Sequence, residues 1–160
     1  MRVKTCDTPP AENPETNPLV LDTNVLIDIW VFACPVALEL WQQAQGNGRR
    51  CLATQATRTE LERVLTYAHL QVRMASAGQA GEQVLAAFDA AMTLVPAAPR
   101  TQPICRDPDD QKFVDLAVQH QATLVSQDKD VLRLAKRLAQ RGVRVLTPYS
   151  MCFRTTPCCG

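Results

Sequence analysis

Short hydrophobic runs alternate with longer segments of mixed polarity along most of the chain. The short runs are typical of buried β-strands, and apolar residues in the longer segments recur at the three-to-four spacing of an amphipathic helix. The expected strands are 19–21, 50–53, 93–95, 122–126 and 143–146. The expected helices are 25–31, a second that begins at 36 and is stopped by Gly46-Asn47-Gly48, 57–67, 80–92, 109–120 and 131–140, the last ended by Gly142. Strands that alternate with helices require crossover connections, so the pattern predicts a three-layer α/β/α sandwich with a parallel sheet.

The two ends of the chain lack this pattern. Residues 1–18 hold four prolines and few large apolar residues, which predicts a flexible N-terminal tail. A second tail is expected at 151–160, so the folded domain should span 19–150.

Composition narrows the possible classes of protein. A net charge of +1 excludes a strongly basic nucleic-acid coat but leaves room for a local basic patch. No apolar run is long enough for a membrane span, and no secretory leader is expected. The seven cysteines form no CxxC motif, which favours a reducing, cytoplasmic setting. Cys34 and Cys51 are expected in the core, and a soft-metal site at Cys152, Cys158 and Cys159 is a minor alternative.

Acidic residues fall where strands end or helices begin, which in a parallel sheet can bring them to one edge. They are Asp22, Glu60, the group Asp107, Asp109 and Asp110, and Asp128. Clustered carboxylates repel one another unless a cation compensates, and hard divalent ions such as Mg²⁺ or Mn²⁺ take oxygen ligands. Such an ion can lower the pKa of water and stabilise charge on a phosphate. Neither histidine lies in one of these clusters, which argues against a zinc hydrolase.

Structural roles compete with this interpretation at several acids. Asp22 could cap the helix that follows it, and Asp107 before Pro108 is a good helix start. Asp110 is the sharper candidate in its group because it shares a helix face with Phe113. Asp115 is expected to be solvated, and Asp130 to cap the helix at 131. Asp28, in an otherwise apolar helix, is a candidate rim residue of the site without an assigned role.

Polar and basic residues near the acids supply further candidates. Asn24 and Ser126 could hold a carboxylate or a metal-bound water in place, although Asn24 also suits a simple turn. Seven cations are expected near the site edge, and solvation is the simpler role for at least half of them. They are Arg49, Arg50, Arg58, Arg63, Arg106, Lys112 and Lys129. Aromatic residues are only 5% of the chain, so extensive base stacking is not expected.

Four segments together resemble the PIN domain, and more narrowly its bacterial branch described as toxin components of toxin–antitoxin systems. They are Leu21–Leu26, Thr59–Leu65, Cys105–Phe113 and Leu124–Leu132, and the resemblance covers roughly 19–150. It implies a five-stranded parallel sheet and a Mg²⁺- or Mn²⁺-dependent ribonuclease. It also implies an RNA substrate, a small antitoxin partner and a homodimer or higher homo-oligomer.

Carried over by motif, the resemblance assigns the metal-binding acids as Asp22, Glu60, Asp110 and Asp128, supported by Asn24 and Ser126. One ion would be held mainly by Asp22 and Asp128, and a second, weaker ion near Glu60 and Asp110 would bind only with substrate. The contacts to nucleic acid would come from Arg58, Arg106, Lys112 and Lys129. Ser126 stands where the family usually has Thr, and the run of acids leaves Asp107 or Asp109 as alternatives to Asp110. A catalytically silent PIN-like module that binds RNA or protein is the second hypothesis. A phosphoryl-transfer enzyme with a nucleophilic Asp22 is disfavoured, because no second Asp lies two positions on.

Overall fold

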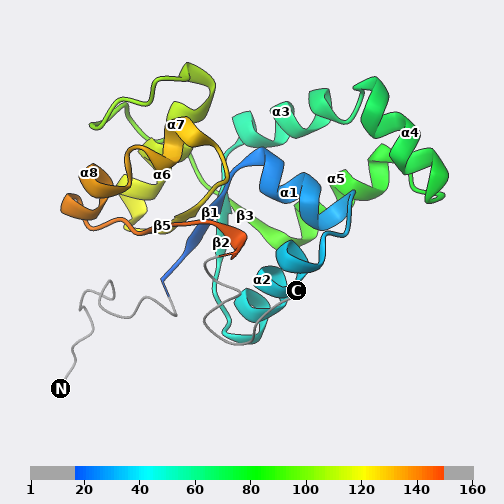
Figure 1. The fold of residues 1–160 in the computed structure, drawn as a ribbon, viewed down its shortest axis with the longest axis horizontal. Helices are drawn as coiled ribbons and strands as arrows, with labels where there is room; N and C mark the ends of the chain where they lie inside the picture. The colour runs from blue at the N-terminus through cyan, green and yellow to red at the C-terminus, as the bar shows by residue number, and fades with distance from the viewer. Residues whose placement is uncertain (1–16, 150–160) are drawn as a thin grey trace.

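The computed structural model describes residues 17–149 and shows five short strands with helices between them (Figure 1). The strands are β1 (Leu19–Leu21), β2 (Cys51–Ala53), β3 (Met92–Leu94), β4 (Thr123–Val125) and β5 (Val145–Leu146). The helices are α1 (Thr23–Trp30), α2 (Pro35–Gly46), α3 (Gln55–Val64), α4 (Ala68–Ser76), α5 (Gly81–Ala91), η3 (Pro108–Asp110), α6 (Gln111–His120), α7 (Lys129–Leu132) and α8 (Ala135–Gln140). All strand pairs are parallel, in the order β3-β2-β1-β4-β5.

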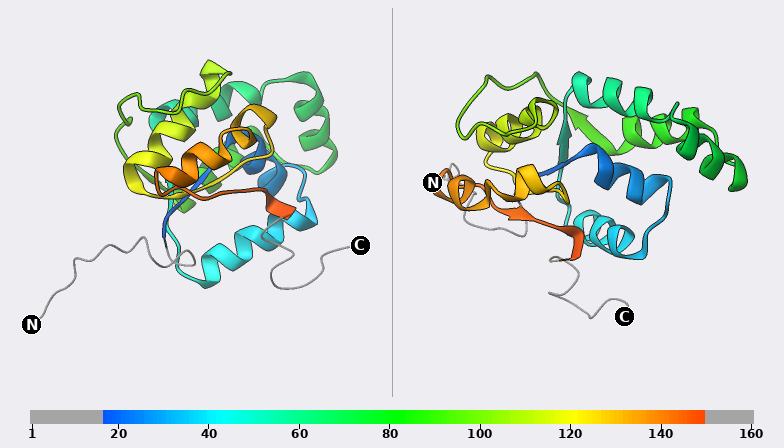
Figure 2. Two further views of the ribbon diagram at one scale, coloured as in Figure 1. Left: turned by 60° about the vertical axis from the view of Figure 1, so that its left-hand side comes forward. Right: turned by 45° about the horizontal axis from the view of Figure 1, so that its top comes forward.

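The sheet separates two hydrophobic cores, because successive side chains of a strand point to opposite faces. Leu19 and Leu21 of β1 belong to the core under α1, α2, α3, α4 and α5. Val20 of the same strand belongs to the other core, under α6 and α8. The ribbon shows α1 and α2 on one side of the sheet and α6 and α8 on the other (Figures 1 and 2). The predicted three-layer α/β/α sandwich with a five-stranded parallel sheet is therefore confirmed.

Two helical regions differ from the sequence prediction. Helix α4 was not expected, since only Leu70 and Met74 of it are buried and its apolar pattern is weak. The single helix predicted over 131–140 is wrong, because the chain breaks between α7 and α8. Val131, Leu134 and Leu138 belong to the same core on both sides of the break. Gly142 does close α8, with a positive φ of 82° that favours glycine.

Strand register sets the position of the acidic residues. Leu21 of β1 is paired with Val125 of β4, so Asp22 and Ser126 follow neighbouring strands at the same edge of the sheet. We call this the carboxyl edge, as the strands end here, and the opposite side the amino edge. In an open α/β sheet the carboxyl edge is where ligands bind.

Two buried polar residues at the amino edge, Asn17 and Arg49, were expected in other parts of the molecule. Asn17, assigned to the tail, is buried and donates from its amide to the backbone oxygen of Gln121. Arg49 is also buried and donates to the backbone and side-chain oxygens of Asn17 at 2.9 and 2.7 Å. The expectation that Arg49 and Arg50 lie at the site edge is thus wrong, since both precede a strand rather than follow one.

Other expectations concern the membrane and the cysteines. Within residues 17–149 no single helix is long and apolar enough to cross a bilayer; α1 and α2 reach that length only together, across a 98° bend. Cys51 is buried, as expected, and Cys34 is partly buried against the same core. The proposed tails (1–16 of the first, and 151–160) and Cys152, Cys158 and Cys159 lie outside the described residues.

Candidate metal centre

Asp22 has both of the roles considered for it, because it caps α1 and faces the other acids. Its Oδ1 accepts from the backbone N–H of Val25 at 3.0 Å, and its Oδ2 accepts from the Ser126 hydroxyl. The residue is only 3% exposed. Burial raises the pKa of Asp22 to about 6 against two hydrogen bonds that lower it, and the charge of Asp128 raises it further.

Ser126 connects Asp22 to Asp128 through a single hydroxyl. Its Oγ donates to Asp22 and accepts from the backbone N–H of Asp128 at 3.0 Å. Asp128 is itself fixed, because its Oδ1 accepts from the backbone N–H of Asp130 at 2.8 Å. The helix cap predicted at Asp130 is therefore wrong, since Asp128 caps α7 and Asp130 lies within its first turn.

Asp107, Asp110 and Asp128 form a compact carboxylate group at the carboxyl edge. One carboxylate oxygen from each lies within 4.8 Å of the others. Asp107 also has the capping role expected for it, since it accepts from the backbone N–H of Asp109 at 3.0 Å. Burial, and then the charges of Asp128, Asp107 and Asp22, raise the pKa of Asp110 to about 7. Its Oδ2 is buried and finds no hydrogen-bond donor among residues 17–149.

This donor set fits a hard divalent cation. Three carboxylate oxygens converge, a fourth carboxylate at Asp22 is electrostatically coupled to them, and a buried oxygen of Asp110 is left without a donor. An unpaired buried carboxylate oxygen is costly, and an ion with oxygen ligands would remove that cost. The arrangement can therefore hold such an ion, with Asp107 added to the predicted set.

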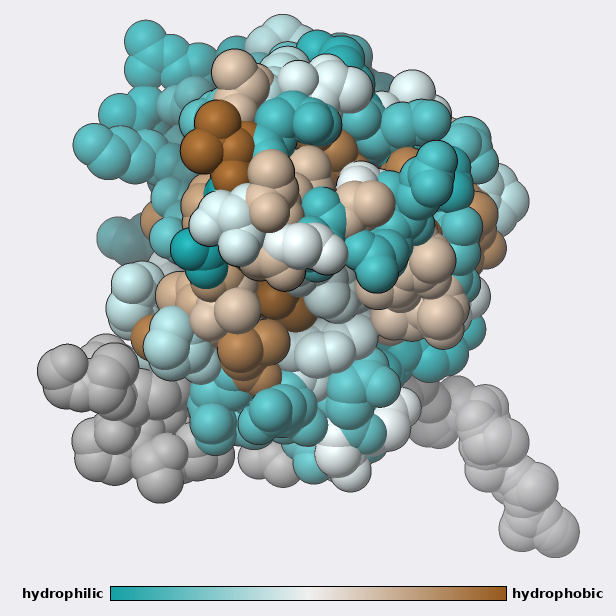
Figure 3. Space-filling model, turned by 90° about the vertical axis from the view of Figure 1, so that its right-hand side faces the viewer, coloured by the Kyte–Doolittle hydropathy of each residue, from teal (hydrophilic) through white to brown (hydrophobic). Residues whose placement is uncertain are grey.

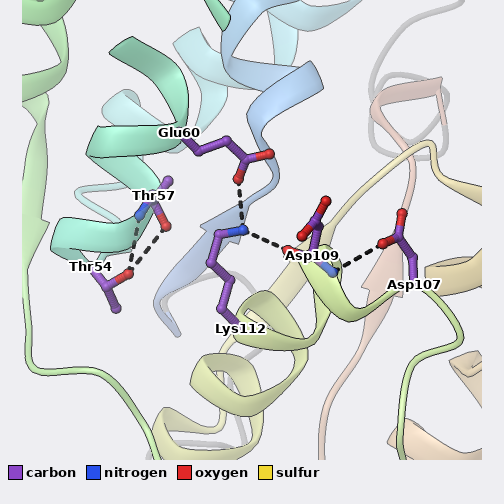
Figure 4. A network of polar contacts seen from close by, with 6 residues as sticks. All are labelled: Thr54, Thr57, Glu60, Asp107, Asp109 and Lys112. Atoms are coloured by element: carbon purple, nitrogen blue, oxygen red, sulfur yellow. Dashed lines mark hydrogen bonds and ion pairs between the residues drawn. The ribbon is translucent and has the colours of Figure 1, made fainter. Parts of the chain in front are cut away.

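Glu60 lies apart from that group and has a different partner. Its Oε1 is 2.6 Å from the Nζ of Lys112 on α6, an ion pair that joins α3 to α6 (Figure 4). Lys112 also donates to the backbone oxygen of Asp109. The α3 helix that carries Glu60 is capped by Thr54, whose hydroxyl accepts from the backbone N–H of Thr57 at 3.3 Å.

A cleft of about 750 Å³ opens beside the carboxylates, with Glu60, Asp109 and Asp128 in its wall. Asn24 and Lys129, both predicted site residues, line it too. Its other lining residues include Asp28, Phe32, Arg63, Tyr67, His69 and Gln127. On the side of the molecule that carries α4, apolar side chains lie in small groups among hydrophilic ones (Figure 3).

The sequence reasoning missed part of this cleft. Asp28, a candidate rim residue without an assigned role, does line the cleft, and its carboxylate accepts from the Gln127 side chain at 2.9 Å. Its signal was an acid within an otherwise apolar helix. Tyr67 and His69, whose ring centres are 6.4 Å apart, lie at the start of α4. Nothing in the sequence marked them as site residues, because the pattern did not predict that helix.

The remaining predicted residues have varied surroundings. Arg58 forms two hydrogen bonds to Asp89, at 2.7 and 2.9 Å, and does not line the cleft; Arg106 is exposed.

The expectation of a solvated Asp115 is wrong. It is 6% exposed, because its Oδ1 accepts from Gln111 and from the backbone of Thr101, in the loop that precedes η3.

Similarity to known proteins identifies the family of this chain. The sequence profile of the PIN domain matches residues 18–130. The chain belongs to the PIN domain family. No protein of curated function matches it significantly in sequence. PIN domains are generally nucleases and typically bind divalent metals, which agrees with the convergent aspartates.

A solved structure shares the fold. The chain is similar to VapBC2 from Rickettsia felis, crystallised with a DNA fragment from its promoter, with a TM-score of 0.58. The alignment covers 81% of this chain and 97% of that one, at 11% sequence identity. At this identity the similarity shows the PIN-like fold alone.

Proposed function

We propose that this PIN domain is a Mg²⁺- or Mn²⁺-dependent endoribonuclease that hydrolyses RNA phosphodiesters. The observation that carries the proposal is the convergence of Asp107, Asp110 and Asp128 within 4.8 Å, beside the buried Asp22. A purely structural role does not explain four mutually repelling carboxylates at a ligand-binding edge.

In this proposal the aspartates hold the ion and their neighbours fix the aspartates. Asp22, Asp110 and Asp128, with Asp107, would be the ligands; the ion would lower the pKa of water and stabilise charge on the phosphate. Ser126 and the Val25 N–H each bind one oxygen of Asp22, so its carboxylate has one orientation. No protein side chain is expected to become covalently attached to the substrate.

The cleft offers a path for single-stranded RNA past these carboxylates. Arg63 and Lys129 line it and can neutralise phosphates, and Phe32, Tyr67 and His69 provide rings on which a base can stack. The choice of RNA over DNA rests on the resemblance of four sequence segments to the bacterial toxin branch. Lys112, Arg58 and Arg106 remain predicted RNA contacts.

We further propose that the protein is the toxin of a toxin–antitoxin pair, acts in the cytoplasm and forms a homodimer or higher homo-oligomer. The similar fold of VapBC2, a toxin–antitoxin complex crystallised with promoter DNA, supports an antitoxin partner. A short reading frame next to this gene, whose product co-purifies with the chain and suppresses RNA cleavage, would support the pairing. The absence of any such neighbour in the genome would contradict it.

Cleavage assays on the purified full chain test the nuclease. RNA should be cut with Mn²⁺ or Mg²⁺ and remain intact in EDTA, and Asp22→Asn should abolish cleavage. Glu82→Gln is the matched control, since it removes an exposed carboxylate on α5 and should cleave like the wild type. Equal cleavage by Asp22→Asn would refute the site. RNA binding without cleavage of any RNA would favour a silent binding module.

A further inference from the structure

Lys112 is the one cation that contacts Glu60 among the described residues, and three contacts fix its ammonium group. Its Nζ lies 2.6 Å from Glu60 Oε1, donates to the backbone oxygen of Asp109, and sits 4.6 Å from the centre of the Phe113 ring. Both side chains of the ion pair are largely buried, 26% exposed for Lys112 and 20% for Glu60. Burial reduces screening by water, so this pair is stronger than an exposed one.

The position of this ammonium matters because of its neighbours. Glu60 does not belong to the compact group of Asp107, Asp110 and Asp128. The charge of Lys112 nevertheless reaches that group, since it lowers the pKa of Asp110 against the larger effects that raise it. Lys112 is thus a fixed positive charge between Glu60 and the aspartates.

A fixed ammonium and a divalent ion compete for the same carboxylate. A cation within hydrogen-bond distance of Glu60 Oε1 occupies the oxygen that a second ion would need and repels that ion. No such cation is paired, among residues 17–149, with Asp107 or Asp110. The two sides of the site therefore differ: Asp107 and Asp110 have no ion-pair partner in the described chain, whereas Glu60 has one.

We propose that Lys112 takes the place of a second divalent ion, so that this centre binds one ion tightly, through its aspartates. Glu60 is then a positioning residue that acts through Lys112 and is not a ligand. This inference rests on the proposed metal-dependent function and specifies its stoichiometry. It replaces the assignment of Glu60 to the metal ligands.

Counting bound Mn²⁺ on the full chain, by equilibrium dialysis with detection of free Mn²⁺ by electron paramagnetic resonance, tests this inference without an activity assay. The wild type should bind one ion tightly. Lys112→Met should bind a second ion at least tenfold more tightly than the wild type does. Lys112→Arg, which keeps the charge, should bind one ion, and Glu60→Gln combined with Lys112→Met should return to one. Lys136→Met is the matched control, since it removes an exposed lysine on α8.

The outcomes separate this inference from the proposed function. Two ions of similar affinity in the wild type, or no change in Lys112→Met, would overturn the role of Lys112 even if RNA is cleaved. No Mn²⁺ binding by a folded wild type would remove both this inference and the metal-dependent nuclease. Circular dichroism establishes that each variant is folded, and Lys112→Gln replaces Lys112→Met if the latter does not fold.

Discussion

The buried polar groups at the two edges of the sheet differ in whether their hydrogen-bond partners are present. At the amino edge, Asn17 Oδ1 accepts from Arg49 at 2.7 Å and from the Thr123 hydroxyl at 3.1 Å, so donors and acceptors match. At the carboxyl edge, carboxylates face one another and the Oδ2 of Asp110 is buried without a donor in the described chain. The paired polar groups of the amino edge stabilise the fold. The unpaired carboxylates of the carboxyl edge lower its stability and leave oxygens available to a ligand.

The largest expected effect comes from a change at the carboxyl edge. Asp110→Asn should lower RNA cleavage by about 10³-fold, because it removes a ligand charge that the transition state needs. The free energy of unfolding without metal should not fall, since the amide removes a mutually repelling charge. Cleavage rates and urea unfolding in EDTA measure the two effects. Lost activity caused by unfolding would contradict the contrast between the edges.

The matching change at the amino edge should have the reverse result. Arg49→Met keeps the aliphatic stem but removes two buried hydrogen bonds, to the backbone oxygen and to Oδ1 of Asn17, although Oδ1 keeps the Thr123 hydroxyl. It should lower the free energy of unfolding by about 3 kcal/mol. RNA cleavage per folded molecule should be unchanged. The adjacent Arg50→Met, at an exposed position, is the control and should change stability by less than about 0.5 kcal/mol. A stability loss equal in both variants would refute the role of the amino edge.

The pH dependence of stability should differ with and without metal. In EDTA the pKa values of Asp22 and Asp110 are raised above those of the unfolded chain, so the folded state binds the extra protons. Stability should therefore decrease as pH rises from about 4 through about 7, by about 2 kcal/mol from Asp22 alone. Urea unfolding at several pH values measures this slope.

Magnesium should reverse this trend, because it binds the ionised carboxylates of the folded state and adds stability at high pH. Asp22→Asn provides the internal control, since it should reduce the slope measured in EDTA and leave the part that comes from Asp110. A slope that is the same in this variant and the wild type would show that Asp22 does not titrate as its burial requires.

The smallest effect is expected in the cleft. Tyr67→Ala removes an exposed ring from the cleft wall and should weaken RNA binding by about fivefold to tenfold, the lower range for loss of one stacked base. Binding can be measured with Asp22→Asn protein, which does not consume the RNA. Val72→Ala, an exposed apolar residue that does not line the cleft, is the control. Equal affinity in all three proteins would place the RNA elsewhere.

Much of the fold could be predicted because its signals are local. Leu19–Leu21 and Thr123–Val125 are buried apolar runs next to turn residues, and they formed strands within a residue or two of the expected bounds. The break at Leu134 could not be predicted, since the apolar spacing on both sides of it fits one continuous helix. Val131 and Leu138, on either side of the break, still belong to one core.

The candidate site was less predictable wherever it depends on contacts between distant segments. The order of strands and acids was enough to bring Asp22, Asp110 and Asp128 to one edge. Nothing local indicated that Asp115 would be buried by the loop before η3, or that Lys112 would bind Glu60, 52 residues earlier in the chain. Arg49 was misplaced for a different reason: it precedes a parallel strand, and its position in the sequence already put it at the far edge.

The pairing of Leu21 with Val125 limits how this domain can change during evolution. Ser126 follows β4 directly and contacts both Asp22 and the backbone of Asp128, so an insertion or deletion inside β1 or β4 would shift one acid by about 3.3 Å and turn alternate side chains to the wrong face. The loop between β3 and Thr101 belongs to no strand and carries no such restriction. Related proteins should therefore differ in length there, while the two central strands keep a constant number of residues.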